Sequence, residues 1–127
     1  MSTDTEWSWV KAVSSCSVAQ KFSELKLDLE RDVEDRNDLV RPGEPTFTIA
    51  SNGSKVGVSK AYGKTLSTVI FSMIDKGISV RDDDGLIFEA MLTINDQREC
   101  RFKIGEQELE PWQMRKRALW KLFFESA

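Results

Sequence analysis

The sequence predicts an α+β fold: an N-terminal helix, an antiparallel sheet of about six strands arranged as a meander, and a C-terminal helix packed on one sheet face. Residues 46–60 and 65–104 contain runs rich in β-branched and aromatic residues, separated by turn formers such as SNGS, DKG and DDDG. Residues 18–40 and 110–124 instead carry apolar residues at the spacings typical of helices. We expect the 127 residues to form one domain over residues 1–127.

The N-terminal segment predicts a first helix, because it holds several apolar residues close together: Trp7, Trp9, Val10 and Val13. Thr3 or Asp4 is expected to cap this helix. Serine competes for backbone hydrogen bonds, so the SSCS run at residues 14–17 is a poor helix interior. The run predicts either a break, with Ser17 capping the next helix, or one helix that continues through it.

A longer helix is predicted from residue 18 onward, with one apolar stripe formed by Val18, Phe22, Leu25, Leu29 and Val33. It should end near residues 38–40, because Pro42 and Gly43 follow. Its second half is strongly acidic, and this surface either meets a basic partner or is solvated. We favour the solvated surface, because charge is the usual property of an exposed helix face.

The strands alternate between apolar and polar residues, which predicts one apolar and one polar face for the sheet. We expect the helices to cover the apolar face. The first two strands should form a hairpin, with Asn52 and Gly53 at the centre of a type I′ turn. In a later strand the alternation places one set of apolar residues on a common face: Leu86, Phe88, Ala90, Leu92 and Ile94.

Residues 65–74 are apolar on both sides of the expected strand. Leu66, Ile70 and Ile74 fall on one side, and Val69, Phe71 and Met73 fall on the other. The second side is covered either by the tryptophan-rich N-terminus or by a second copy of the chain. An exposed patch of Phe71, Met73 and Met91 would be a contact site of the second kind.

The C-terminal helix should start at Glu110 and Pro111, with Gln113 completing a capping box. Its polar side is basic, with Arg115, Lys116, Arg117 and Lys121. Together with the two tryptophans of this helix, these cations could contact nucleic acid, or the basic helix could lie beside the acidic one. We expect the four tryptophans of the chain to fill the core, with an apolar ligand pocket as the alternative.

Composition excludes several classes of chemistry. The chain has no histidine, which removes Ser–His–Asp catalysis, Cys–His catalysis and His-containing zinc sites within it. The two cysteines, Cys16 and Cys100, are far apart and form no CxxC pair. Their pattern is more typical of buried thiols in a reducing cytoplasm than of a disulfide.

The segment MSTDTEWSWVKAV does not resemble a secretory signal, and no apolar run reaches the roughly 20 residues that span a bilayer. We therefore expect a cytoplasmic chain without a membrane partner.

The remaining motifs also point away from a reactive centre. The Asp82, Asp83, Asp84 and Gly85 run fails as a calcium loop, because Val80 and Met91 would occupy two ligand positions, and a hairpin turn explains it. The dispersed glycines form no phosphate-binding loop. Glu89 lies mid-strand and is expected to pair with Arg101 instead of acting as a general acid or base. We expect no cofactor and no metal.

The leading functional prediction is a non-enzymatic, bacterial-type protein–protein interaction module: an adaptor, a chaperone-like subunit or a toxin-neutralising protein. Its partner would be another protein or a second copy of the chain, bound through a sheet face or a charged helix. The residues predicted to form this surface are Phe71, Met73, Met91, Arg101, Lys103, Arg115 and Lys116. The alternative is a small-ligand-binding or enzymatic domain with a pocket between sheet and helices. Nucleic-acid binding through the basic C-terminal helix is weaker, because the net charge is −3.

Overall fold

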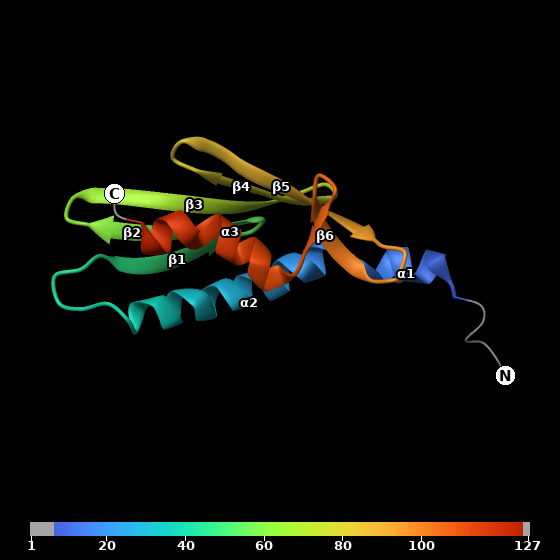
Figure 1. The fold of residues 1–127 in the computed structure, drawn as a ribbon, viewed down its shortest axis with the longest axis horizontal. Coiled ribbons are helices and arrows are strands. Elements are labelled where there is room, and N and C mark those ends of the chain that lie inside the picture. Colours follow the sequence, from blue (N-terminus) through green and yellow to red (C-terminus); the bar gives the residue numbers. More distant parts are fainter. Residues whose placement is uncertain (1–6, 126–127) are drawn as a thin grey trace.

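The computed structural model describes residues 7–125, and its helices and strands follow one another in the predicted order (Figure 1). The elements are α1 (Trp9–Ser15), α2 (Val18–Asn37), β1 (Thr46–Asn52), β2 (Lys55–Tyr62), β3 (Thr65–Ile74), β4 (Gly77–Asp82), β5 (Gly85–Ile94), β6 (Cys100–Ile104), β7 (Gln107–Leu109) and α3 (Pro111–Phe124). The α+β prediction is confirmed. The sheet has seven strands instead of about six. The additional strand, β7, has only three residues and no run of β-branched residues to reveal it.

The sheet is a meander in which every strand pairs antiparallel with its neighbours in the chain, in the order β1 to β7. Helices α2 and α3 lie side by side over one face of this sheet, which we call the inner face (Figure 1). The short helix α1 lies apart from them and contacts β5. Residues 7–125 therefore form two layers, and no helix within them covers the other face of the sheet, which we call the outer face.

The core lies between the inner face and the two long helices. Phe71 is fully buried at its centre and is flanked across the strands by Val56 and Val80. Met73 is partly buried and packs against the same core. Met91 lies on the outer face, where it is directly opposite Gly77. The predicted contact patch of Phe71, Met73 and Met91 is therefore wrong: its members lie on opposite faces, and α2 and α3 cover the first two.

The outward-facing side of β3 is the exposed one. Leu66 and Ile70 are solvent-exposed there, whereas Val69 and Phe71 are buried. Strand alternation correctly predicted two apolar sides for residues 65–74. It could not predict which side the helices cover, because both sides carry large apolar residues.

A β-bulge interrupts the pairing of β4 with β5 between Val80 and Arg81. Val80 is opposite Phe88, but Arg81 is opposite Leu86, so one extra residue enters β5 at Ile87. Leu86 consequently points outward and is exposed, while Ile87 packs against the core. The prediction that Leu86 and Phe88 share a face is wrong for this reason.

The first hairpin turns one residue later than predicted. Asn52 pairs with Lys55, so the turn residues are Gly53 and Ser54. Gly53 has φ 62° and Ser54 does not have a positive φ. A positive φ at the first turn position alone is the pattern of a type II′ turn, for which Gly at that position suffices. The predicted type I′ turn centred on Asn52 and Gly53 is wrong.

The helix ends agree with most of the predicted caps. Ser17 accepts a hydrogen bond from the Gln20 backbone N–H at 3.2 Å, which confirms a break before α2. Helix α1 starts at Trp9 and is capped by Ser8; the predicted caps Thr3 and Asp4 lie outside the described residues. At the start of α3, the predicted capping box is present.

Cys16 and Cys100 form a disulfide, with their Cα atoms 5.5 Å apart. The prediction of two free buried thiols is therefore wrong. Cys16 lies at the junction of α1 and α2, and Cys100 is the first residue of β6. The meander brings these positions together across 84 residues of chain, a proximity that sequence spacing does not reveal.

Among residues 7–125, no helix is both long and apolar enough to cross a lipid bilayer.

Candidate interaction surface

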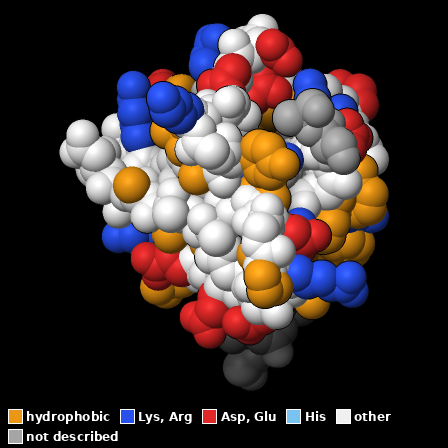
Figure 2. Space-filling view, turned by 90° about the vertical axis from the view of Figure 1, so that its left-hand side faces the viewer, with side chains coloured by type: hydrophobic (Ala, Val, Ile, Leu, Met, Phe, Trp, Pro, Cys, Tyr) orange, Lys and Arg blue, Asp and Glu red, His pale blue; other side chains and the backbone are white. Residues whose placement is uncertain are grey.

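The exposed aromatic residues of α3 form one stripe along the helix. Trp112, Trp120 and Phe124 are 53%, 48% and 56% exposed, and they lie at intervals of four or eight residues. Trp7 and Trp9 are exposed as well, near α1. The prediction that the tryptophans fill the core is wrong. Figure 2 views the end of the molecule that carries the last turn of α3, and hydrophobic side chains are exposed there between charged ones.

The stripe forms one wall of a groove between α2 and α3, which we call the α2–α3 groove. Its volume is about 370 Å³. Leu119 and Phe123 of α3 form its floor, and both are buried against the core. The opposite wall comes from α2 and the residues just after it, including Asp32, Asp35 and the exposed Leu39.

Two cations in the groove lie over aromatic rings. The Lys116 Nζ is 6.0 Å from the ring centre of Trp112 and 5.7 Å from that of Trp120. The Arg36 guanidinium is 4.8 Å from the Phe47 ring and 5.4 Å from the Phe124 ring. Cation–π attraction of this kind fixes the orientation of exposed aromatic side chains at a gain of about 0.5–1 kcal/mol each. The groove walls are therefore partly ordered before anything binds.

Arg115 joins the two helices beneath the groove. It donates to Asp32 at 2.7 Å and to Asp28 at 3.2 Å, and its side chain is only 14% exposed. The basic helix thus lies beside the acidic helix, one of the arrangements that the sequence allowed. Arg115 lines the groove but is neutralised within the chain, so it is not a free cation for a partner.

The remaining predicted surface residues lie away from this groove. Arg101 and Lys103 face the outer side of β6, opposite Thr93 and Met91. Glu89 is exposed opposite Ser79 and does not pair with Arg101. Of the predicted set, the structure therefore brings Arg115 and Lys116 together in the groove, whereas Met91 and Lys103 lie opposite each other on the outer face beside Arg101.

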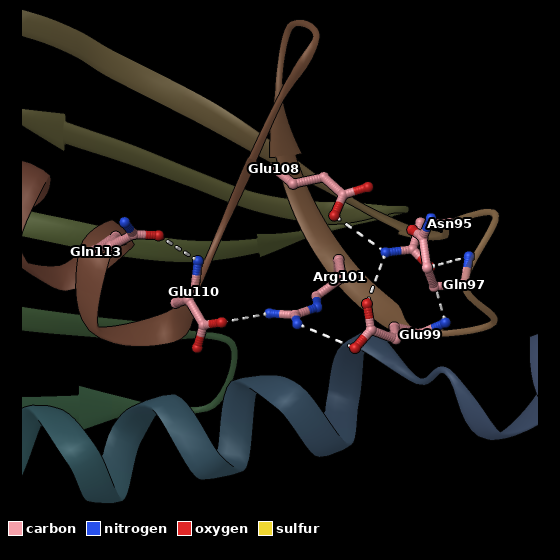
Figure 3. A network of polar contacts seen from close by, with 7 residues as sticks. All are labelled: Asn95, Gln97, Glu99, Arg101, Glu108, Glu110 and Gln113. Carbon is pink, nitrogen blue, oxygen red and sulfur yellow. Dashed lines mark hydrogen bonds and ion pairs between the residues drawn. The ribbon is translucent and has the colours of Figure 1, made fainter.

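Arg101 belongs to a polar network at the corner of the sheet (Figure 3). Its guanidinium donates to Glu110 at 2.9 Å and to Glu99 at 3.2 Å. The Asn95 Nδ2 donates to both Glu99 and Glu108, and the Asn95 Oδ1 accepts two backbone N–H groups. The network connects the β5–β6 turn, β7 and the start of α3. Its role is therefore to hold these elements together.

The network shifts the pKa of two of its members. Hydrogen bonding from Asn95, and then from Arg101, lowers the pKa of Glu99 below its ordinary value of 4.5. Hydrogen bonds to Glu110 and Glu99 raise the pKa of Arg101. Because the folded pKa of Glu99 is depressed, its stabilising effect is present above pH 4.5 and is lost as the pH falls through the folded value.

An Arg101→Gln variant is expected to raise the pKa of Glu99 towards its ordinary value, because one charged donor is lost. An NMR titration of the Glu99 carboxyl measures this. A Gln97→Ala variant is the matched control, since Gln97 contributes only its backbone N–H to the network. An unchanged Glu99 pKa in Arg101→Gln would contradict the contact.

The carboxylates do not assemble into a metal site. Within residues 7–125, no group of three or more His, Cys, Asp and Glu side chains is arranged to hold a metal ion. In the β4–β5 turn, Asp82 accepts the Asp84 backbone N–H, and Asp83 accepts that of Thr68. These residues stabilise the turn.

Comparison with known proteins gives no family: the chain matches no protein-family model, no curated protein and no solved structure.

The sequence did contain a signal for the groove. Trp112, Lys116, Trp120 and Phe124 recur every four residues, beside a separate stripe of Met114, Ala118 and Leu122 that is buried. The expectation that Trp112 and Trp120 fill the core concealed this second stripe.

Proposed function

We propose that this chain is a non-enzymatic protein–protein interaction module that binds its partner in the α2–α3 groove. The observation that supports the proposal is the exposed stripe of Trp112, Trp120 and Phe124 around an apolar floor. Tryptophan and arginine are enriched at the residues that dominate binding energy, which lie in apolar centres with a charged rim. The groove has this composition, with Arg36 inside it and acids along α2.

The groove is long enough for a secondary-structure element of a partner. From Trp112 to Phe124 the helix rises by roughly 18 Å, at about 1.5 Å per residue. Three turns of a partner helix, or a comparable length of another surface, could contact the whole stripe. The groove thus replaces the sheet-face patch that the sequence suggested.

A small apolar ligand is the second candidate. The groove volume of about 370 Å³ is within the range of ligand pockets. Against it, the groove lies between two helices at the surface, not between sheet and helices. Nucleic acid is disfavoured further, because Arg101 and Arg115 are both held by carboxylates of the chain itself.

The redox state of Cys16 and Cys100 bears on the cellular location of the chain. The sequence suggests the cytoplasm, whereas a disulfide is typical of oxidising compartments. We propose an oxidising location for the disulfide-bonded form of the chain. Thiol-specific labelling of the protein in its native host tests this: labelled Cys16 and Cys100 would instead favour the cytoplasm.

A Trp112→Ala/Trp120→Ala variant is expected to lose binding. Both side chains are about half-exposed, so the fold should survive, and loss of such anchors reduces affinity by about tenfold or more. The measurement compares the amount of each protein recovered from a native host extract with the tagged wild type and with the variant. Leu66→Ala/Leu86→Ala, which alters exposed residues of the outer face, is the matched control. Loss of recovery in the control, but not in the tryptophan variant, would contradict the proposal.

A further inference from the structure

Two cations of the α2–α3 groove, Lys116 and Arg36, have no carboxylate partner. Both lie over aromatic rings, so their charges are held among the apolar side chains of the groove. Within residues 7–125, neither takes part in an ion pair. Arg36 donates there from its Nε only, to the Phe123 carbonyl at 2.9 Å. Both cations therefore have donors to offer to an occupant of the groove.

The carboxylates that line the groove do not cancel this charge. Asp32 is already bound by Arg115 at 2.7 Å. Asp35 has no ion pair within the described residues, but it is exposed, and water and salt screen its charge. Among the groups without an ion pair there, the groove thus has two cations and one carboxylate. Its free charge is positive, although α2 as a whole is acidic.

We infer that the occupant of the groove is an acidic amphipathic helix of a partner protein. This inference rests on the proposed function, because it names the chemistry of the partner bound at the same surface. A partner that closed over the groove would remove water from Lys116 and Arg36, and an unpaired buried cation is costly. Carboxylates on the partner avoid this cost, whereas a wholly apolar or basic surface does not.

The positions of the two cations predict the spacing of these carboxylates. The Lys116 Nζ is 6.0 Å or less from the ring centres of Trp112 and Trp120. Arg36 lies beside Phe124, which follows Lys116 by eight residues, or about 12 Å along the helix axis. On a partner helix, positions i and i+7 share one face and lie about 10.5 Å apart, a distance that long cationic side chains can match. We therefore expect carboxylates at i and i+7, with apolar side chains at i+3 and i+4 that contact the tryptophans.

Three synthetic helical peptides of about 18 residues test this inference. They share leucine at i+3 and i+4 and differ only at i and i+7, where they carry glutamate, glutamine or lysine. Fluorescence anisotropy of each labelled peptide, titrated with the full chain, gives its affinity. We expect the glutamate peptide to bind at least tenfold more tightly than the glutamine peptide, and the lysine peptide to bind most weakly. The preference for glutamate should decrease as the salt concentration rises.

Substitutions of Lys116 locate the effect in the groove. Lys116 is exposed, so the fold should survive its replacement. Lys116→Gln should bind the glutamate peptide about tenfold less tightly than wild type and the glutamine peptide equally well. Lys116→Glu should bind the lysine peptide more tightly than wild type does. Lys103→Gln, which removes a cation from the outer face, is the matched control and should leave all three affinities unchanged.

Equal affinities of wild type for the glutamate and glutamine peptides overturn the inference. Unchanged binding of the glutamate peptide to Lys116→Gln, or no binding of any peptide, also overturns it. The proposed function is tested separately with Trp112→Ala/Trp120→Ala. If wild type does not prefer glutamate but the tryptophan variant binds the glutamine peptide more weakly, the acidic partner is wrong and the groove remains the binding surface. If the peptides bind wild type and the tryptophan variant equally, the proposed function fails as well.

Discussion

Replacing both bonded cysteines, in a Cys16→Ser/Cys100→Ser variant, is expected to lower the free energy of unfolding by about 4 kcal/mol. The bond closes a long loop, with a sequence separation of 84. Cross-linking such a loop restricts the unfolded ensemble far more than the folded state. The loss is a large fraction of the roughly 5–15 kcal/mol that stabilises a typical domain.

The local consequence should appear first at the N-terminal end. No residue of α1 is buried, and the disulfide ties its C-terminal end to β6. Hydrogen exchange should therefore accelerate in residues 9–16 of the variant before it changes in the core strands.

Urea denaturation of the wild type, with and without a reducing agent, measures the global effect. The serine variant is the control, since its midpoint should not respond to the reductant. A wild-type shift of less than about 1 kcal/mol on reduction would contradict a stabilising bond of this span.

A Phe71→Ala variant is expected to lower the free energy of unfolding by about 3–5 kcal/mol. Phe71 is fully buried between Val56 and Val80, under α2 and α3. Truncation removes a large apolar side chain from water-free surroundings and leaves a cavity that the sheet cannot readily close.

Met91→Ala is the matched control, because both residues were predicted for the same surface and only one is buried. Its effect on unfolding should stay below about 1 kcal/mol, since the side chain lies on the exposed outer face. If the two substitutions lowered the free energy of unfolding equally in urea denaturation, this would contradict the finding that the Phe71 side of β3 is the side that packs in the core.

Much of the fold was predictable because local rules govern it. The apolar stripe of α2, the capping by Ser17 and the capping box at Glu110 depend on residues a few positions apart. Turn formers between β-rich runs gave the meander. A chain of hairpins needs no long-range pairing, so strand order follows directly from sequence order.

The features that escaped prediction depend on contacts between distant segments. The bulge at Val80 and Arg81 moves Leu86 outward, although simple alternation places it with Phe88. The Cys16–Cys100 bond depends on how the sheet folds back to α1. The choice between the two apolar sides of β3 depends on where α2 and α3 pack, and that choice determined which surface stays exposed.

Covalent footprinting of the chain, free and bound to its partner, most directly tests whether the α2–α3 groove is the binding surface. Labelling reagents that react with exposed side chains report the tryptophans of the groove and the apolar residues of the outer face in one experiment. We expect Trp112 and Trp120 to be protected in the complex, while Leu66, Leu86 and Met91 are labelled as in the free chain. Protection of the outer-face residues, with unchanged labelling of Trp112 and Trp120, would contradict the assignment and return the interaction to the sheet.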